Sequence, residues 1–354
     1  MVSAHKLGAA GVTVAAAGVM GAICLVLGLP LPWLLGGLLA SSVLAIGGVA
    51  PFGEAVGLPQ NIRWYCVPVI GVSIGTAMTP QVLEDATRWW PSLLALLAYI
   101  PVARALSFWA VTRMGGVDRA TSFFGTMPGG FIESVVMAEE AGADDALVSV
   151  MQLLRLIICL TMIPLAFFFL TGGAVGSAGG AVIGTAELSF TDWLILIAAG
   201  AVGALAGRAM KLPAWVITGP FVLSCVVHLV GWVEGGPPAW LVGVTQAVIG
   251  ITVGQRFVGK DHRLLARAAR VAAVAVAVML AVSGLFAAAL QGLVEDGWRA
   301  VFLAFAPGGL AEMSLVALSL EIGVVYVTLH HVLRIILSVV WAKWAGRRVF
   351  GLVQ

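Results

Sequence analysis

The stretch VAAVAVAVMLAVSGLFAAAL, residues 271–290, decides the fold class of this chain. An α-helix needs about 20 apolar residues to cross a bilayer, and this stretch supplies that length without a charge. The whole 354-residue chain shares its character, with 61% hydrophobic residues, 10% charged residues and a mean hydropathy of +1.06. Soluble domains carry roughly 25% charged residues, so this chain cannot cover a water-facing surface. The sequence therefore predicts an all-α polytopic membrane protein.

Ten long apolar runs predict about ten transmembrane helices, with the lipid bilayer as the surrounding partner. Their approximate bounds are 8–27, 32–50, 62–82, 90–112, 146–171, 191–208, 213–232, 238–257, 268–290 and 323–342. Ten helices use up the chain and leave no soluble domain. A DNA-binding protein needs a basic polar face, so we expect no nucleic-acid partner.

Short motifs recur between the two halves of the chain at a nearly constant offset. The pairs are Leu29-Pro30 with Leu212-Pro213 (183 residues), Val69-Ile70-Gly71 with Val248-Ile249-Gly250 (179), and Pro128-Gly129-Gly130 with Pro307-Gly308-Gly309 (179). Several matches in the same order are not chance. We predict two homologous membrane repeats, 1–172 and 188–354, joined by a Gly/Ala-rich linker at 173–187.

The basic residues favour an inverted arrangement of the repeats. With five spans in each half and a cytoplasmic N-terminus, fourteen of the 19 Lys and Arg residues face the cytoplasm. Arg88 and Arg299 then lie outside, and Arg104, Arg155 and Arg334 lie within spans. Six spans per half would place the basic cluster 256–270 outside, against the positive-inside rule. We therefore expect inverted repeats and two cytoplasmic termini.

Each repeat contains a segment broken by Pro-Gly-Gly, at residues 119–141 and about 298–320. Proline removes a backbone donor and two glycines add freedom, so each segment predicts a re-entrant hairpin or a broken spanning helix. The charge placement selects the hairpin. The free N–H groups of the half-helix after each break favour an anion. The alternative is that each Pro-Gly-Gly only lets helices cross closely.

Four charged residues recur with the breaks: Glu133 matches Glu312, and Arg155 matches Arg334, each at 179 residues. An ionised group at bilayer depth costs several kcal/mol, so each needs a partner. In one interpretation, Glu133 pairs with Arg155 and Glu312 pairs with Arg334. In the other, the arginines bind a carboxylate substrate while a glutamate carries the coupling proton.

One residue pair joins this candidate site by helical spacing. Gln152 lies three residues before Arg155, and His331 holds the same place before Arg334. His331 is interpreted either as a proton site or as a hydrogen-bonded core histidine. The substrate-binding prediction thus covers Pro128, Gly129, Gly130, Glu133, Gln152, Arg155, Pro307, Gly308, Gly309, Glu312, His331 and Arg334.

The sequence lacks the motifs of metal, cofactor or catalytic sites. No HxxxH, Glu-xx-His, GxGxxG, Walker or Gly-x-Ser-x-Gly pattern occurs in the 354 residues. We therefore expect no catalytic residues, metal or cofactor, and a protein that is not an enzyme.

The paired motifs resemble those of the AbrB-type membrane proteins, a duplicated bacterial family. The first half reads Met127-Pro128-Gly129-Gly130 and Met151-Gln152-Leu153-Leu154-Arg155, and the second reads Ala306-Pro307-Gly308-Gly309 and His330-His331-Val332-Leu333-Arg334. His330-His331 departs from the family's Met-Gln. Members carry the labels ammonia monooxygenase and transcriptional regulator, yet this sequence shows neither metal ligands nor a soluble DNA-reading face. The resemblance implies a multi-pass protein of the bacterial inner membrane.

Inverted repeats with interrupted helices are typical of secondary transporters, whose sites lie where the repeats meet. The sequence thus predicts a secondary active transporter of a small organic anion, coupled to H⁺ or Na⁺ and of elevator type. A non-transporting membrane scaffold or sensor that affects gene expression through a partner is the alternative. A homodimer is left open.

Overall fold

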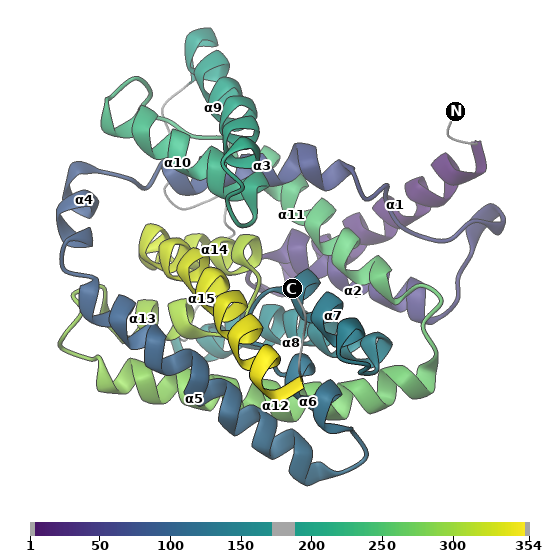
Figure 1. Cartoon of the computed structure of the whole chain (residues 1–354). Coiled ribbons are helices and arrows are strands. Elements are labelled where there is room, and N and C mark those ends of the chain that lie inside the picture. Colours follow the sequence, from purple (N-terminus) through teal and green to yellow (C-terminus); the bar gives the residue numbers. More distant parts are fainter. Residues whose placement is uncertain (1–3, 172–187, 351–354) are drawn as a thin grey trace. The chain divides into compact units, whose positions relative to one another are not determined.

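The computed structural model describes residues 4–171 and 188–350, and the predicted linker 173–187 lies outside them. Each of the ten apolar runs contains a helix (Figure 1). These helices are α1 (Ala4–Val26), α2 (Pro32–Ile46), α3 (Ile62–Gly75), α5 (Trp90–Met114), α8 (Asp145–Thr171), α9 (Phe190–Ala209), α10 (Trp215–Leu229), α11 (Ala239–Gly254), α12 (His262–Ala289) and α15 (Val324–Phe350).

The shorter helices lie between these ten, and four of them belong to the broken segments. They are α4 (Pro80–Ala86), α6 (Arg119–Gly125), α7 (Phe131–Glu140), α13 (Gly297–Phe305) and α14 (Leu310–Ser319), with 3₁₀ turns at Pro51–Gly53 and Gln255–Phe257. The described part of the chain is all-helical, as predicted.

Helix length determines how many of these helices can be identified as crossing the bilayer. Within the described residues, six helices are long and apolar enough to cross a bilayer, namely α1, α5, α8, α9, α12 and α15. A seventh span is added if α3 and α4, which meet at a bend of 87°, act as one. Helices α2 and α10 have 15 residues each, a rise of only about 22 Å. The count of ten and the inverted layout therefore stay predictions.

The chain folds into two compact units, and each takes elements from both halves of the sequence. Among the described residues, the first unit comprises 4–83, 161–171, 188–260 and 314–325, and the second comprises 84–160, 261–313 and 326–350. The first unit is built on α1, α2 and α3 with α9, α10 and α11, and the second on α5–α7 with α12, α13 and α15.

Close packing in the first unit follows the sequence repeat. A Cβ on Gly71 would clash with the carbonyl oxygen of Ile217, and one on Gly250 would clash with that of Leu34. Gly250 follows Gly71 by 179 residues, and Ile217 follows Leu34 by 183. The two offsets are those of the sequence motifs, so the same contact is made twice with the halves exchanged. Small residues allow this approach, as is common between membrane helices.

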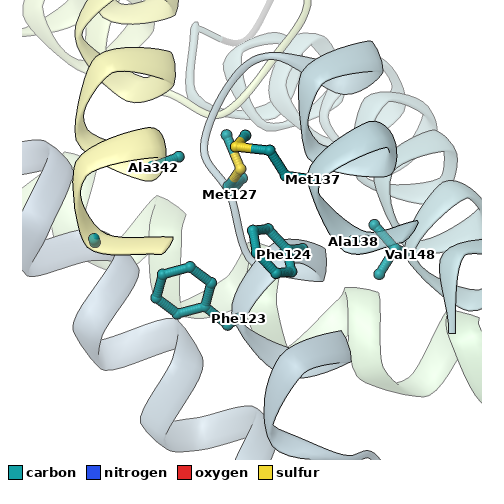
Figure 2. Packing of buried hydrophobic residues seen from close by; sticks show 8 residues of the cluster. Phe123, Phe124, Met127, Met137, Ala138, Val148 and Ala342 are labelled. Atoms are coloured by element: carbon teal, nitrogen blue, oxygen red, sulfur yellow. The ribbon is translucent and has the colours of Figure 1, made fainter. Parts of the chain in front are cut away.

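An aromatic and methionine cluster fills the core of the second unit around the first break (Figure 2). Phe123 and Phe124 come from α6, Met127 from the break itself and Met137 from α7. The side chains of Met127 and Met137 face each other beside Ala342 of α15 (Figure 2). This packing fixes both arms of the first broken segment against α15.

Candidate functional site

Both Pro-Gly-Gly motifs interrupt helices, as the sequence predicts. Helix α6 ends at Gly125 and α7 begins at Phe131, whereas α13 ends at Phe305 and α14 begins at Leu310. The half-helices have seven to ten residues, too few to span a bilayer singly. Each break leaves carbonyl groups at the end of one half-helix and N–H groups at the start of the next without helical partners.

Arg155 of α8 binds the end of the first half-helix. Its side chain is buried, and its Nη1 donates to the carbonyl oxygen of Met127. Gln152, one turn earlier, donates from Nε2 to the carbonyl of Phe124 at 2.9 Å and, at 3.4 Å, to that of Gly125. Two side chains of α8 thus satisfy the carbonyl groups that the break frees.

Arg334 of α15 does the same at the second break. Its Nη1 donates to the carbonyls of Phe305 (3.3 Å) and Ala306, and its Nη2 donates to that of Gly308 at 2.8 Å. The side chain is fully buried. Ala306 follows Met127 by 179 residues, as Arg334 follows Arg155, so this arginine–carbonyl contact is also made in both halves.

His331 takes the place of Gln152 and is a hydrogen-bonded core residue. Its Nε2 lies 3.0 Å from the carbonyl oxygen of Leu303, and its Nδ1 lies 2.9 Å from Nη2 of Arg334. A guanidinium can only donate, so Nδ1 accepts and Nε2 carries the proton. The geometry therefore fits a neutral imidazole that orients Arg334.

Glu133 and Glu312 occupy the third position of the half-helices that follow the breaks. A Cβ on Gly130 would lie 3.1 Å from Oε2 of Glu133, and one on Gly309 would clash with Oε2 of Glu312. Each carboxylate therefore folds back over the glycine that precedes its helix, as the glutamate of a capping box does. Glu133 is exposed, whereas Glu312 is 5% exposed.

The four charges thus match the four half-helix ends. A helix carries roughly half a positive charge at its N-terminus and half a negative charge at its C-terminus. The arginines bind the C-terminal ends of α6 and α13, and the glutamates lie at the N-terminal ends of α7 and α14. Backbone ends are partners that residue types alone do not reveal. The ion pairs of Glu133 with Arg155 and of Glu312 with Arg334 stay predictions.

The second unit brings both breaks against the two arginine-bearing helices. Gly129 lies beside Ile335 and Ser338 of α15, whereas Gly309 lies beside Leu156 of α8. Arg155 and Arg334 are within electrostatic range of each other. All twelve predicted site residues fall in this unit.

Ser338 is a polar residue that the sequence prediction did not include, and it lies in the same unit. The hydroxyl of Ser338 points at Gly129, and a Cβ on that glycine would lie 3.4 Å from it. Within the part of the chain that the structure describes, this hydroxyl has no hydrogen-bond partner, and neither do Nε of Arg155 and Nε of Arg334. These buried groups leave donors available for a ligand or water. The repeat could not point to Ser338, because Cys159 stands at the matching position.

Arg104 is a third buried arginine. Its position within a predicted span was expected from the sequence, but no motif assigned it a role. Its Nη2 donates to the carbonyl of Phe123 at 3.0 Å, and its guanidinium lies 3.7 Å from the centroid of the Phe123 ring. Trp341 covers it at 4.6 Å. Arg104 therefore anchors α6 through a backbone carbonyl and two cation–π contacts.

An aspartate precedes the first half-helix of each broken segment. Asp118 accepts a hydrogen bond from the backbone N–H of Thr121 at 2.9 Å as the N-cap of α6. Burial raises the pKa of Asp118, but the hydrogen bonds from Thr121 and from the backbone N–H groups of Ala120 and Asp118 together outweigh it and hold the pKa below the ordinary 3.8. Burial raises the pKa of Asp296, before α13, although the indole of Trp89 donates to it at 2.8 Å.

Comparison with known proteins identifies relatives over most of the chain. The family model described as "Transition state regulatory protein AbrB" matches residues 33–350. The "Uncharacterized protein YhjN" of Bacillus subtilis (strain 168) is 27% identical over 346 residues, 93% of this chain and 89% of its own length. The "Putative regulator AbrB" of Escherichia coli (strain K12) is 25% identical over 295 residues, 82% of this chain and 81% of its own.

Proposed function

Since this chain belongs to the AbrB family, whose model covers residues 33–350, and carries two broken helices with buried arginines, we propose that it is a secondary active transporter of a small organic anion. It works in the bacterial inner membrane with both termini cytoplasmic, is not an enzyme and couples transport to H⁺ or Na⁺. The observation that carries the proposal is the pair of breaks in one unit, each with a buried arginine.

The available hydrogen-bond donors support an anionic substrate. Arg155 and Arg334 donate hydrogen bonds from their Nη groups to backbone carbonyls, and within the described chain their Nε groups have no partner. Each arginine can therefore add one charge-assisted hydrogen bond to a carboxylate without releasing the break it holds. The N-termini of α7 and α14 add backbone N–H donors, which also favour an anion.

The division into two units supports an elevator-type mechanism. The second unit contains both breaks and all twelve site residues, whereas the first is built on α1–α3 and α9–α11. An elevator needs one body that carries the substrate and another that stays in place. Many transporters are built from repeats in which one bundle moves against the other.

The test is uptake by proteoliposomes that contain the full chain. We expect one or more of radiolabelled acetate, benzoate, succinate and citrate to accumulate under an imposed H⁺ or Na⁺ gradient. Arg155→Ala and Glu312→Gln should abolish coupled uptake, whereas Arg113→Ala, which removes an exposed arginine of α5, should retain it. Unchanged coupled uptake in Arg155→Ala would refute the site.

The membrane sensor is the second candidate, and the names of the family and of the E. coli relative favour it. A sensor would show no flux for any anion of the panel, and its function would depend on the exposed Arg263 and Arg267 of α12. Arg267 pairs with Asp144 at 3.9 Å. The same vesicle assay therefore separates the two candidates.

The inverted topology can be tested by single cysteines on either side of α10. Lys211 and Glu234 are exposed and flank this helix. In a cysteine-free background, a membrane-impermeant maleimide added to intact cells should label Glu234→Cys and spare Lys211→Cys. Labelling of Lys211→Cys from outside would refute the cytoplasmic placement of that loop.

A further inference from the structure

The first unit contains an apolar groove between α3 and α9, two helices that pack against each other (Figure 1). Its cavity of about 330 Å³ falls within the range of about 300–1,000 Å³ that is usual for ligand sites. None of the described residues that line it carries a charge, and the main ones are Trp64, Tyr65, Pro68, Gly200, Ala201 and Ala204. A polar solute would lose its water here without gaining partners, so the groove fits a hydrocarbon chain.

Small residues of α9 keep the groove hollow. A Cβ on Gly200 would make only ordinary contacts, 3.7 Å from Cγ2 of Val72 and 3.8 Å from Cβ of Pro68. The groove is open on one side, because Trp64 and Tyr65 on its rim are 56% and 77% exposed. Helix α9 is long and apolar enough to cross a bilayer. We therefore expect the groove to open toward lipid chains and not toward water.

The end of the groove at Trp64 is basic. The indole of Trp64 packs edge-on against that of Trp215, with 5.7 Å between ring centroids, and the guanidinium of Arg208 lies 5.7 Å from the centroid of the Trp215 ring. Lys211 donates its backbone N–H to the carbonyl of Arg208 at 3.1 Å, and both side chains are exposed. The first turn at the opposite end of α9 carries Asp192 instead. The charge along this helix therefore favours an anion at the Trp64 end.

The basic end and the hollow part of the groove are one leaflet apart or less. Gly200 precedes Arg208 by eight residues, which is a helical rise of about 12 Å. Half of the hydrocarbon core of a bilayer is about 15 Å thick. A lipid whose headgroup lies at Arg208 can therefore place an acyl chain beside Gly200 without leaving its own leaflet.

We propose that the groove between α3 and α9 binds an anionic phospholipid. One acyl chain fills the cavity beside Gly200, and the headgroup phosphate lies against Arg208 and Lys211. Basic residues at the membrane surface attract anionic lipids, and tryptophans such as Trp64 and Trp215 are common at headgroup depth. This site lies in the unit that lacks the Pro-Gly-Gly breaks, so the inference goes beyond the proposed transport function and does not depend on it.

Thermal unfolding of the purified full-length protein in detergent tests the choice of lipid. Dioleoyl phosphatidylglycerol should raise the unfolding midpoint by at least about 2 °C. Dioleoyl phosphatidylcholine, with the same chains and no net charge, should give less than half of that shift. Equal shifts would show that the groove takes any lipid chain, and no shift would show that it takes neither; both results overturn the inference. An equal shift with inorganic phosphate alone would also overturn it, because the anion would then bind without a chain.

Substitution at the two ends of the site tests the assignment. Gly200→Leu fills the cavity at a position with room for a side chain, so it should keep the lipid-free midpoint and lose the shift with phosphatidylglycerol. Arg208→Gln combined with Lys211→Gln should reduce that shift to the level of phosphatidylcholine. A preference for phosphatidylglycerol that persists in the double variant overturns the headgroup assignment, and a shift that persists in Gly200→Leu overturns the place of the chain.

A matched pair of basic residues supplies the control. Arg347 and Arg348 are exposed in the last turn of α15, and the guanidinium of Arg348 lies 4.6 Å from the centroid of the Trp344 ring. Arg347→Gln combined with Arg348→Gln removes the same charge from a helix that does not line the groove. This variant should keep the full preference for phosphatidylglycerol. Loss of the preference here would mean that overall charge attracts the lipid, and it would overturn the site.

Discussion

The two Pro-Gly-Gly breaks share a backbone plan and differ in the polar groups that complete it. In both, an arginine 27 or 28 residues on binds the freed carbonyls, and a glutamate folds back at the third position of the following helix. The first break uses Gln152 and leaves Glu133 exposed, whereas the second uses His331 and encloses Glu312. Compensation of the half-helix ends is therefore the common requirement, and an enclosed carboxylate is special to the second break.

The largest effect should come from the arginines, and it should differ between the breaks. Arg334 donates to three carbonyls, whereas Arg155 donates to that of Met127. A hydrogen bond that involves a charged group contributes about 1.5–3 kcal/mol. We therefore expect Arg334→Ala to lower the free energy of unfolding by about 3 kcal/mol or more, and Arg155→Ala by about half as much.

Thermal unfolding in one detergent measures this difference. Arg334→Lys should not recover the midpoint, because an ammonium lacks the planar fork that reaches several carbonyls at once. Equal losses for the two alanine variants would show that the breaks are held alike.

Substitution of His331, which lies one turn before Arg334, tests whether an amide can replace the imidazole. His331→Leu leaves the Leu303 carbonyl and a donor of Arg334 without partners and should cost about 1–3 kcal/mol. His331→Gln should cost less than about 1 kcal/mol, because Gln152 shows that an amide reaches the matching carbonyl. A loss as large for glutamine as for leucine would mean that the second break needs the ring itself.

Alanine at the matching glycines should separate backbone strain from displacement of a carboxylate. Gly130 has φ of +73°, and a Cβ there would also lie 2.9 Å from Cγ2 of Val339, so Gly130→Ala should lose about 1 kcal/mol of stability or more. At Gly309 the new Cβ meets the flexible end of Glu312, so Gly309→Ala should cost little stability and shift that carboxylate. Gly129→Ala is the stability control, because its nearest neighbour would lie 3.4 Å away. A large loss at Gly309 would contradict a movable Glu312.

Much of this comparison could be predicted from the sequence. Apolar length located a helix in each of the ten runs, and Pro-Gly-Gly located both breaks, because proline and paired glycines act locally on the backbone. The spacing from Gly130 to Glu133 is also that of a capping box, so the position of the glutamates at the helix starts was open to prediction.

The partners of the arginines could not be predicted in the same way. Arg155 and Arg334 bind backbone carbonyls, which every residue carries, so no side-chain pattern marks them. The composition of the two units was equally hidden, since it depends on contacts such as Gly71 with Ile217 between distant segments. Helix length was overestimated at 32–50, because apolar residues continue past the end of α2 at Ile46 and no charge marks the turn.

The smallest effects on stability should come from Asp118 and Asp296, the aspartates that precede the two broken segments. As pH falls, the contribution of one should decrease and that of the other should increase. The lowered pKa of Asp118 means that its carboxylate stabilises the fold above the ordinary value of 3.8, and this contribution is lost as pH falls through the folded pKa. The raised pKa of Asp296 means that its contribution is present at low pH and lost as pH rises through the folded pKa. Thermal unfolding midpoints measured from pH 7 to pH 3 should therefore differ from those of the wild type in opposite ways when the titration of Asp118 or that of Asp296 is removed.

Asparagine at either position removes that titration and keeps an oxygen acceptor. Asp118→Asn should cost at most a few tenths of a kcal/mol at pH 7, because asparagine caps helices about as well as aspartate. It should also remove the loss of stability near the acid end of the scan. Asp296→Asn should leave the bond from Trp89 in place and raise stability slightly at pH 7, since the buried charge is gone. If both variants change the pH dependence of the unfolding midpoint in the same direction, Asp118 and Asp296 play the same role. The two broken segments then differ only at the Pro-Gly-Gly breaks.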